Sequence, residues 1–228
     1  MHAKLLSHSQ PTFRIHAGEL SAQGLENIQD LIAYCARVSN PANQANRKTT
    51  SRLLNYLVKH KHWSPFEMAS ACIEIETTRD IARQLLRHRS FSFQEFSQRY
   101  ADIRDLDDDF VLREARLQDE KNRQNSIASE DERLQMMWNS KQGEVIRAAK
   151  EAYNWAIENG IAKEQARAVL PEGNTVSRLY VNGTIRSWIH YIELRSANGT
   201  QKEHMDVAVA VADAISKIYP DVTKFISE

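Results

Sequence analysis

The clearest local signal in the sequence is a strand that leads directly into a helix. Residues 71–77, Ala-Cys-Ile-Glu-Ile-Glu-Thr, alternate apolar and polar side chains and are rich in branched residues, which is typical of a strand with one buried face. Thr78 can cap a helix that begins at Arg79, and helical periodicity continues to about His88. We expect the chain to turn there, so the strand and the helix would hold the following residues in fixed positions.

Other segments carry weaker but consistent periodicities. A second strand is expected at 175–181, and alternating patches such as Thr12–Ile15 indicate a strand within residues 1–20. These patterns predict an α+β fold in which helices gather around a small sheet. Apolar residues recur at the spacing of one helix face in 25–38, 50–60, 134–159, 184–195 and 201–218, with a short helix at 163–170 that Pro171 stops.

The composition narrows the class of protein. The 228 residues suffice for one large domain, and we treat 1–228 as a single catalytic domain in which the polar stretch 113–133 is a solvated segment or insert without assigned chemistry. Thirty basic and thirty acidic residues balance, so no overall field attracts nucleic acid or an acidic membrane. Cys35 and Cys72 lack disulfide or zinc spacing, which fits a reducing, cytoplasmic location. No stretch has the length of a signal-peptide core or a membrane span.

The stretch from Gln84 to Tyr100 has the densest chemistry. It contains Arg87, Arg89 and Arg99, with a histidine, amides, a glutamate and serines interleaved with aromatic residues. Guanidinium groups bind phosphates through paired hydrogen bonds, and aromatic faces stack on heterocycles, so this stretch suits an anionic, planar ligand. The alternative is a solvated basic helix end, where cations also complement the helix dipole.

The arrangement Arg87-His88-Arg89, seven residues and then Ser97 resembles the signature of the flavin-dependent thymidylate synthases. Glu95, Arg99 and Tyr100 also match that family's pattern around the serine. Three further elements resemble the family: His62 to Glu67, Ala166 to Pro171, and Arg186 to Arg195. Thr184 departs from the asparagine of many relatives, and residues 196–199 lack a histidine that some members carry.

The resemblance implies a small, mainly antiparallel sheet surrounded by helices and a methyltransferase that converts dUMP to dTMP. Methylenetetrahydrofolate would donate the one-carbon unit, and FAD reduced by NADPH would supply the hydride. It further implies a homotetramer with shared active sites. The balanced charge and the lack of a long apolar run predict no nucleic acid or membrane partner. No metal is expected, because His60 and His62 have no third ligand at useful spacing.

The resemblance also implies roles for individual residues. Arg195 would be catalytic, since a fixed cation stabilises negative charge that develops on the uracil ring. Ser97 is interpreted as a hydrogen-bond donor to the nucleotide phosphate, and no covalent enzyme nucleophile is expected. Flavin contacts are expected from His62, Ser64, Arg87, His88, Arg89, Glu95, Thr184, Arg186 and His190. Nucleotide contacts are expected from Gln84, Arg87, Glu95, Phe96, Ser97, Gln98, Arg99, Arg167 and Arg195.

Helix geometry adds one expectation that comes from the residues alone. Arg186, His190 and Glu193 share a helix face, whereas Arg195 projects roughly opposite Arg186. If both arginines are functional, they serve different ligands or different subunits. Two other classes stay open at this point: an RNA-binding module that stacks bases on the aromatic residues, and a flavin reductase of another kind.

Overall fold

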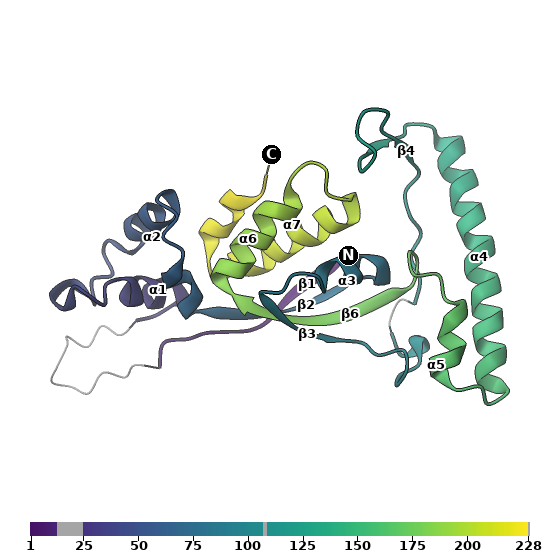
Figure 1. Cartoon of the computed structure of the whole chain (residues 1–228), viewed down its shortest axis with the longest axis horizontal. Coiled ribbons are helices and arrows are strands. Elements are labelled where there is room, and N and C mark those ends of the chain that lie inside the picture. Colours follow the sequence, from purple (N-terminus) through teal and green to yellow (C-terminus); the bar gives the residue numbers. More distant parts are fainter. Residues whose placement is uncertain (13–24, 107–108, 228) are drawn as a thin grey trace.

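The computed structural model describes residues 1–12, 25–106 and 109–227, and these form an α+β fold (Figure 1). The strands are β1 (His2–His8), β2 (Ser70–Thr78), β3 (Phe91–Glu95), β4 (Arg116–Gln118), β5 (Ser126–Ala128) and β6 (Val176–Thr184). The helices are α1 (Ile28–Ala36), α2 (Thr50–Lys59), α3 (Arg79–Leu85), α4 (Glu132–Glu158), α5 (Lys163–Ala166), α6 (Ile185–Ser196) and α7 (Lys202–Ser216). Short 3₁₀ turns include η2 (Ser64–Met68) and η4 (Arg167–Val169).

A four-stranded antiparallel sheet is the centre of the fold. Its strand order is β1-β2-β6-β3, so the two long strands lie in the middle and β3 forms an edge. Ser70 pairs with Thr184 at one end of the β2–β6 ladder, and Thr78 pairs with Val176 at the other. The strand β3, which belongs to the stretch from Gln84 to Tyr100, therefore pairs with β6 along one side, and its other side is an edge of the sheet.

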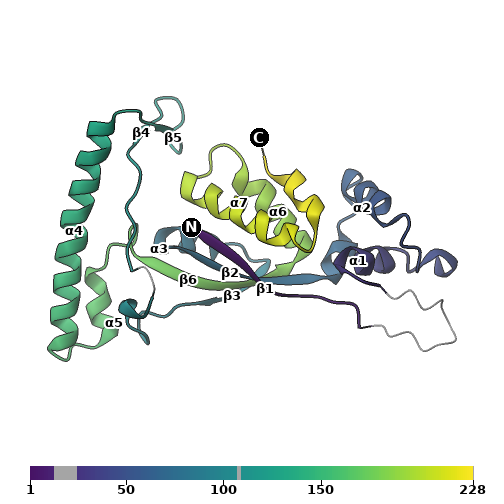
Figure 2. The same cartoon turned by 180° about the vertical axis from the view of Figure 1, so that it is seen from behind.

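The main core lies between this sheet and the helices α6 and α7, which cover one of its faces (Figures 1 and 2). Alternate residues of β2 and β6 point into the core, whereas Glu74, Glu76 and Tyr180 lie on the other face. Each large apolar side chain buried in this way contributes about 1.5–3 kcal/mol. Trp188 is fully buried, and its indole N–H donates to the carbonyl of Ala71 at 3.0 Å, so its one polar atom is satisfied.

Two parts extend beyond the sheet at opposite ends (Figures 1 and 2). The helices α1 and α2 lie at one end, and α4 with α5 and the β4–β5 hairpin lies at the other. The long helix α4 packs on α5 and η4 through a small second core that includes Ile103, Tyr153 and Leu170. Much of its remaining surface is apolar and exposed, at Met136, Met137, Trp138, Val145 and Trp155.

The expected helices and the strands at 71–77 and 175–181 are confirmed, with ends that shift by a few residues. The strand within residues 1–20 is β1, while the patch at Thr12–Ile15 extends into residues outside those described. The capping prediction was wrong in its chemistry. Thr78 is the N-cap residue, but its hydroxyl donates to Asp80 Oδ1 at 2.5 Å and accepts no helix N–H. The strand β3 and the β4–β5 hairpin were not predicted.

Candidate functional site

The arginine motif occupies a tight turn between α3 and β3. The helix ends at Leu85, and the backbone N–H of His88 donates to the Leu85 carbonyl at 3.0 Å, which closes its last turn. Arg87 and Arg89 point to the exposed surface, whereas His88 is half-buried. The helix therefore ends before the arginine motif and the chain turns there, close to the position that the sequence predicts.

His88 contacts Arg195 of α6, which joins two of the predicted motifs. Arg195 Nε donates to His88 Nε2 at 3.0 Å. Because a guanidinium group can only donate, this contact places the imidazole proton on Nδ1. Burial, together with the positive charges of Arg195 and His190, lowers the pKa of His88 to about 4. The ring is therefore neutral near pH 7.

Gln84, one turn before His88, is held from the other side of the site by α7. Its Nε2 donates to Gln201 Oε1 at 2.8 Å, and its Oε1 lies 3.1 Å from Nδ1 of His204. Gln84, His88 and Arg195 thus form one group at the junction of α3, α6 and α7. The structure brings these three predicted residues together.

A cavity of about 570 Å³ opens beside the N-terminal half of α6. Arg186 and His190 line it from α6, together with Trp63, Glu67 and Ser90 from other segments. Arg186 forms an ion pair with Glu67. Glu193 also borders the cavity, which confirms the predicted shared face of Arg186, His190 and Glu193. An aromatic face with cationic and hydrogen-bonding groups around it suits a planar, anionic ligand.

Three predicted flavin residues lie near this cavity without bordering it. His62 is exposed just after α2, and Ser64 is the exposed first residue of η2. The hydroxyl of Thr184 accepts from the backbone N–H of Ser187 at 3.1 Å, so Thr184 caps α6. This hydroxyl therefore stabilises the start of α6, a role that the sequence pattern did not indicate.

The remaining predicted residues lie at the far end of β3. Arg99 pairs with Glu164 through Nη2 at 3.1 Å, and Arg167 Nε donates to the Glu164 carbonyl at 3.3 Å. Both arginines therefore contact the same residue, Glu164. Ser97 is exposed, Phe96 is half-buried, and Gln98 is buried with an Nε2 group that has no partner within the described residues.

Glu95 ends β3 and faces a buried arginine that the sequence did not indicate. It accepts from the Ser177 hydroxyl at 3.0 Å and lies 3.6 Å from Nη1 of Arg79. Burial lowers the pKa of Arg79, and the charge of Glu95 acts against this shift. The spacing of residues could not indicate Arg79, because it begins α3 as a solvated helix residue would. Its partner Glu95 lies close to it only because β3 pairs with β6 in the folded sheet.

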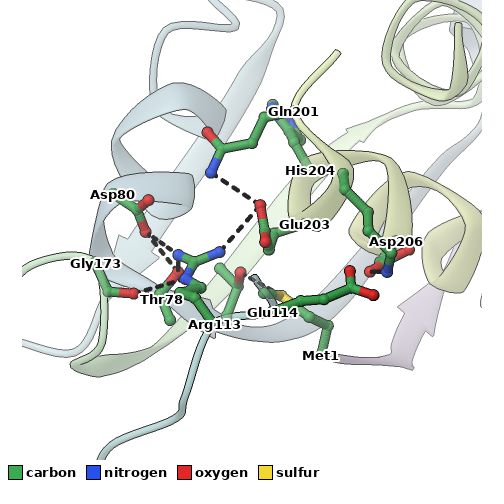
Figure 3. A network of polar contacts seen from close by, with 12 residues as sticks. Met1, Thr78, Asp80, Arg113, Glu114, Gly173, Gln201, Glu203, His204 and Asp206 are labelled. Carbon is green, nitrogen blue, oxygen red and sulfur yellow. Dashed lines mark hydrogen bonds and ion pairs between the residues drawn. The ribbon is translucent and has the colours of Figure 1, made fainter. Parts of the chain in front are cut away.

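Arg113 is the second unexpected residue, and it changes the interpretation of the polar stretch 113–133 (Figure 3). Its side chain is only 14% exposed. Arg113 Nη2 donates to Thr78 and Asp80 at 2.5 and 2.6 Å, and Nε donates to the Gly173 carbonyl at 2.8 Å. Nη1 lies 3.2 Å from Glu203 of α7. The first residue of that stretch is thus an anchor, and most of the rest is exposed as expected.

Within the described ranges, no three His, Cys, Asp or Glu side chains are arranged to hold a metal ion. None of the helices seen in residues 1–12, 25–106 and 109–227 combines the length and apolar character needed to cross a bilayer.

Comparisons with known proteins give the same answer as the motifs. Residues 22–221 match the family described as thymidylate synthase complementing protein. A probable flavin-dependent thymidylate synthase of Paramecium bursaria Chlorella virus 1 is 49% identical over 224 residues, which is 98% of each chain. The flavin-dependent thymidylate synthase of a Synechocystis strain is 46% identical over 97% of each chain.

A solved structure is similar over nearly the whole chain. The UMP/dUMP methylase PolB from Streptomyces cacaoi, bound with 5-Br dUMP, superposes with a TM-score of 0.77 and 26% identity, over 98% of this chain and 93% of that one. The fold and the four sequence elements therefore agree with one another. The chain belongs to the flavin-dependent thymidylate synthase family.

Proposed function

We propose that this protein converts dUMP to dTMP with methylenetetrahydrofolate as one-carbon donor and with FAD reduced by NADPH. The observation that carries the proposal is the contact between His88 and Arg195, beside Gln84. Two motifs that resemble the family separately, 107 positions apart, meet in the fold through this hydrogen bond. The names of the similar proteins support the flavin and the deoxyuridylate substrate.

Arg195 would act on the uracil ring. Within the described residues no carboxylate forms an ion pair with it, and its hydrogen-bond partner His88 is neutral, so its full positive charge is available. Formation of the new carbon–carbon bond makes the pyrimidine a carbon nucleophile, and negative charge grows on its carbonyl oxygens. A guanidinium group fixed by His88 would stabilise that charge without reorganising.

The nucleotide phosphate would bind at the far end of β3. Ser97, Arg99 and Arg167 present a hydroxyl and two guanidinium groups there, and Glu164 holds the two arginines close to each other. Gln84, Arg87, Glu95, Phe96 and Gln98 would complete the nucleotide contacts. The exposed Arg87 would also be available to a second ligand.

The cavity beside α6 would hold the flavin. Its residues fit such a group, because Arg186 and His190 supply donors and Trp63 supplies an aromatic face in a space of about 570 Å³. His62, Ser64, Arg87, His88, Arg89, Glu95 and Thr184 would add contacts around it. Bound FAD would supply the hydride chemistry, while these side chains bind and orient it and exclude water.

A homotetramer with shared sites and a cytoplasmic location are part of the proposal. The proposed residues are distributed along β3 and are not enclosed in one pocket, which suits a site that other subunits complete. The exposed apolar residues of α4 suit a contact between subunits. Light scattering on the purified protein tests this, and a monomer that is fully active would contradict it.

The enzyme assay decides between this proposal and the two other classes. We expect flavin absorbance in the purified protein and dTMP formation that requires dUMP, NADPH and methylenetetrahydrofolate together. Oxidation of NADPH that does not depend on dUMP or folate would indicate another kind of flavin reductase. RNA binding that falls steeply with salt and is indifferent to dUMP would indicate a nucleic-acid module.

A further inference from the structure

We propose that His204 of α7 is a positioning residue for nucleotide binding, whose Nδ1–H holds the side-chain amide of Gln84 in one orientation. The inference rests on the proposed function, in which Gln84 contacts dUMP. His204 itself is fully buried and is separated from Gln84 by 120 positions in the sequence. It therefore acts on the nucleotide through Gln84.

The directions of the hydrogen bonds that lead to His204 follow from one carboxylate, that of Glu203, which contacts Gln201 (Figure 3). Burial opposes ionisation of Glu203, but its own backbone N–H, Gln201 and the charge of Arg113 outweigh burial and lower its pKa. Glu203 is therefore an acceptor only. Gln201 must present its Nε2 to Glu203, at 2.9 Å, which turns its Oε1 towards Gln84.

The same logic continues through Gln84 to His204. Since Gln201 Oε1 accepts, Gln84 must donate to it with Nε2, and the Gln84 oxygen then faces Nδ1 of His204. That oxygen can only accept, so Nδ1 carries the proton. Burial, with Arg195 and His88 adding to it, lowers the pKa of His204 to about 3, so the ring keeps a single proton near pH 7.

The unused atoms of this network are informative. The Nε2 atom of His204 is buried and has no partner within the described residues, so Nδ1 makes the polar contact of this ring. Gln84 retains one N–H and one lone pair after its two contacts. A fixed amide edge of this kind complements the adjacent C=O and N–H groups of a pyrimidine, whereas a rotated amide would present the wrong order of donor and acceptor.

Two substitutions of His204, which place an amide N–H at different positions, test the proposal. His204→Asn places an amide N–H near the former Nδ1, and His204→Gln places it near the former Nε2. We expect His204→Asn to bind dUMP within about twofold of the unchanged protein in calorimetric titration. We expect His204→Gln to bind about fivefold more weakly, the factor that one neutral hydrogen bond contributes. The KM for dUMP should follow the dissociation constant, with kcat changed less.

A third variant guards against misfolding at the buried site. Gln201 is exposed, and Gln201→Leu removes the acceptor on the other side of Gln84 without disturbing the core. We expect a similar loss of dUMP affinity at an unchanged melting temperature. Equal dUMP binding by the unchanged protein and all three variants would overturn the positioning role and leave the proposed function intact. A protein without any dUMP affinity would overturn the proposed function itself.

Discussion

Arg113 offers the sharpest test of how the fold supports the site. The substitution Arg113→Met keeps most of the length and apolar volume of the side chain but removes every donor. Thr78, Asp80, the Gly173 carbonyl and Glu203 would each lose a contact. The Glu203 carboxylate is 16% exposed, so little water can replace the lost charge there. We therefore expect Arg113→Met to destabilise the protein.

The magnitude follows from the kinds of contact that are lost. Removing one partner of a buried ion pair costs about 3–5 kcal/mol, and Asp80, which is 31% exposed, places this pair at the lower end. The contact from Nη1 to Glu203 is too poorly aligned to be a hydrogen bond, so it contributes attraction between charges only. We expect about 3 kcal/mol, which corresponds to a fall of roughly 6–12 °C in Tm for a chain of this size.

Thermal and urea unfolding at one protein concentration would measure this change. The matched control is Arg133→Met, because Arg133 is exposed at the start of α4 and should tolerate the change within about 0.5 kcal/mol. Arg113→Lys should fall between the two, since it keeps the charge but not the planar fork. An Arg113→Met protein whose Tm lies within about 2 °C of that of the unchanged protein would refute the argument.

Three other predictions follow from single contacts. Arg195→Ala should lower kcat by roughly 10²–10³-fold while the protein still binds flavin by absorbance; dTMP formation at the native rate would remove Arg195 from the mechanism. Gly183→Ala places a Cβ 2.3 Å from the buried ring of Phe91 and should cost about 1–3 kcal/mol in urea unfolding, whereas Gly143→Ala in α4 meets no atom within 4 Å and should stabilise the helix by about 0.5–1 kcal/mol. The pKa of His204, about 3 when folded, lies below its ordinary value of 6.5, so its neutral ring loses stability to the unfolded chain as pH falls below 6.5. The loss from His204 should reach roughly 1.4 kcal/mol per pH unit. His88, whose pKa is about 4, adds a similar loss in both proteins, so urea unfolding at pH 6.5 and 5.0 should show a smaller loss in His204→Asn than in the unchanged protein. Equal losses in the two proteins would exclude the contribution of His204.

Local patterns in the sequence were sufficient for most elements of the fold. The alternation in 71–77 and the 3.6-residue periods of the helices depend on neighbouring residues only, so they can be recognised without knowledge of tertiary contacts. The strand β3 has the same alternation, Phe91-Ser92-Phe93-Gln94-Glu95, but the sequence analysis predicts only a turn after about His88 and no strand here. The three-residue strands β4 and β5 are too short to give a periodic signal.

The candidate site could be predicted only in part. The motif identified Arg195 and His88, but their contact spans 107 positions and depends on how α6 packs against the turn after α3. Arg113 gave no signal, because a buried arginine and a solvated one look alike within a charged stretch. His204 could not be predicted either. The apolar period of its helix α7 explains why the side chain is buried but does not indicate its hydrogen bond with Gln84.

The polar contacts around Arg113 and Gln84 also bear on the order in which the chain folds. Arg113 reaches Asp80 across 33 positions and Gly173 across 60, and His204 reaches Gln84 across 120. Such long loops close slowly, whereas the helices need only local contacts. The region around Arg113 and Gln84 therefore acquires its final geometry late, so weakening these contacts should accelerate unfolding in stopped-flow experiments and leave refolding nearly unchanged.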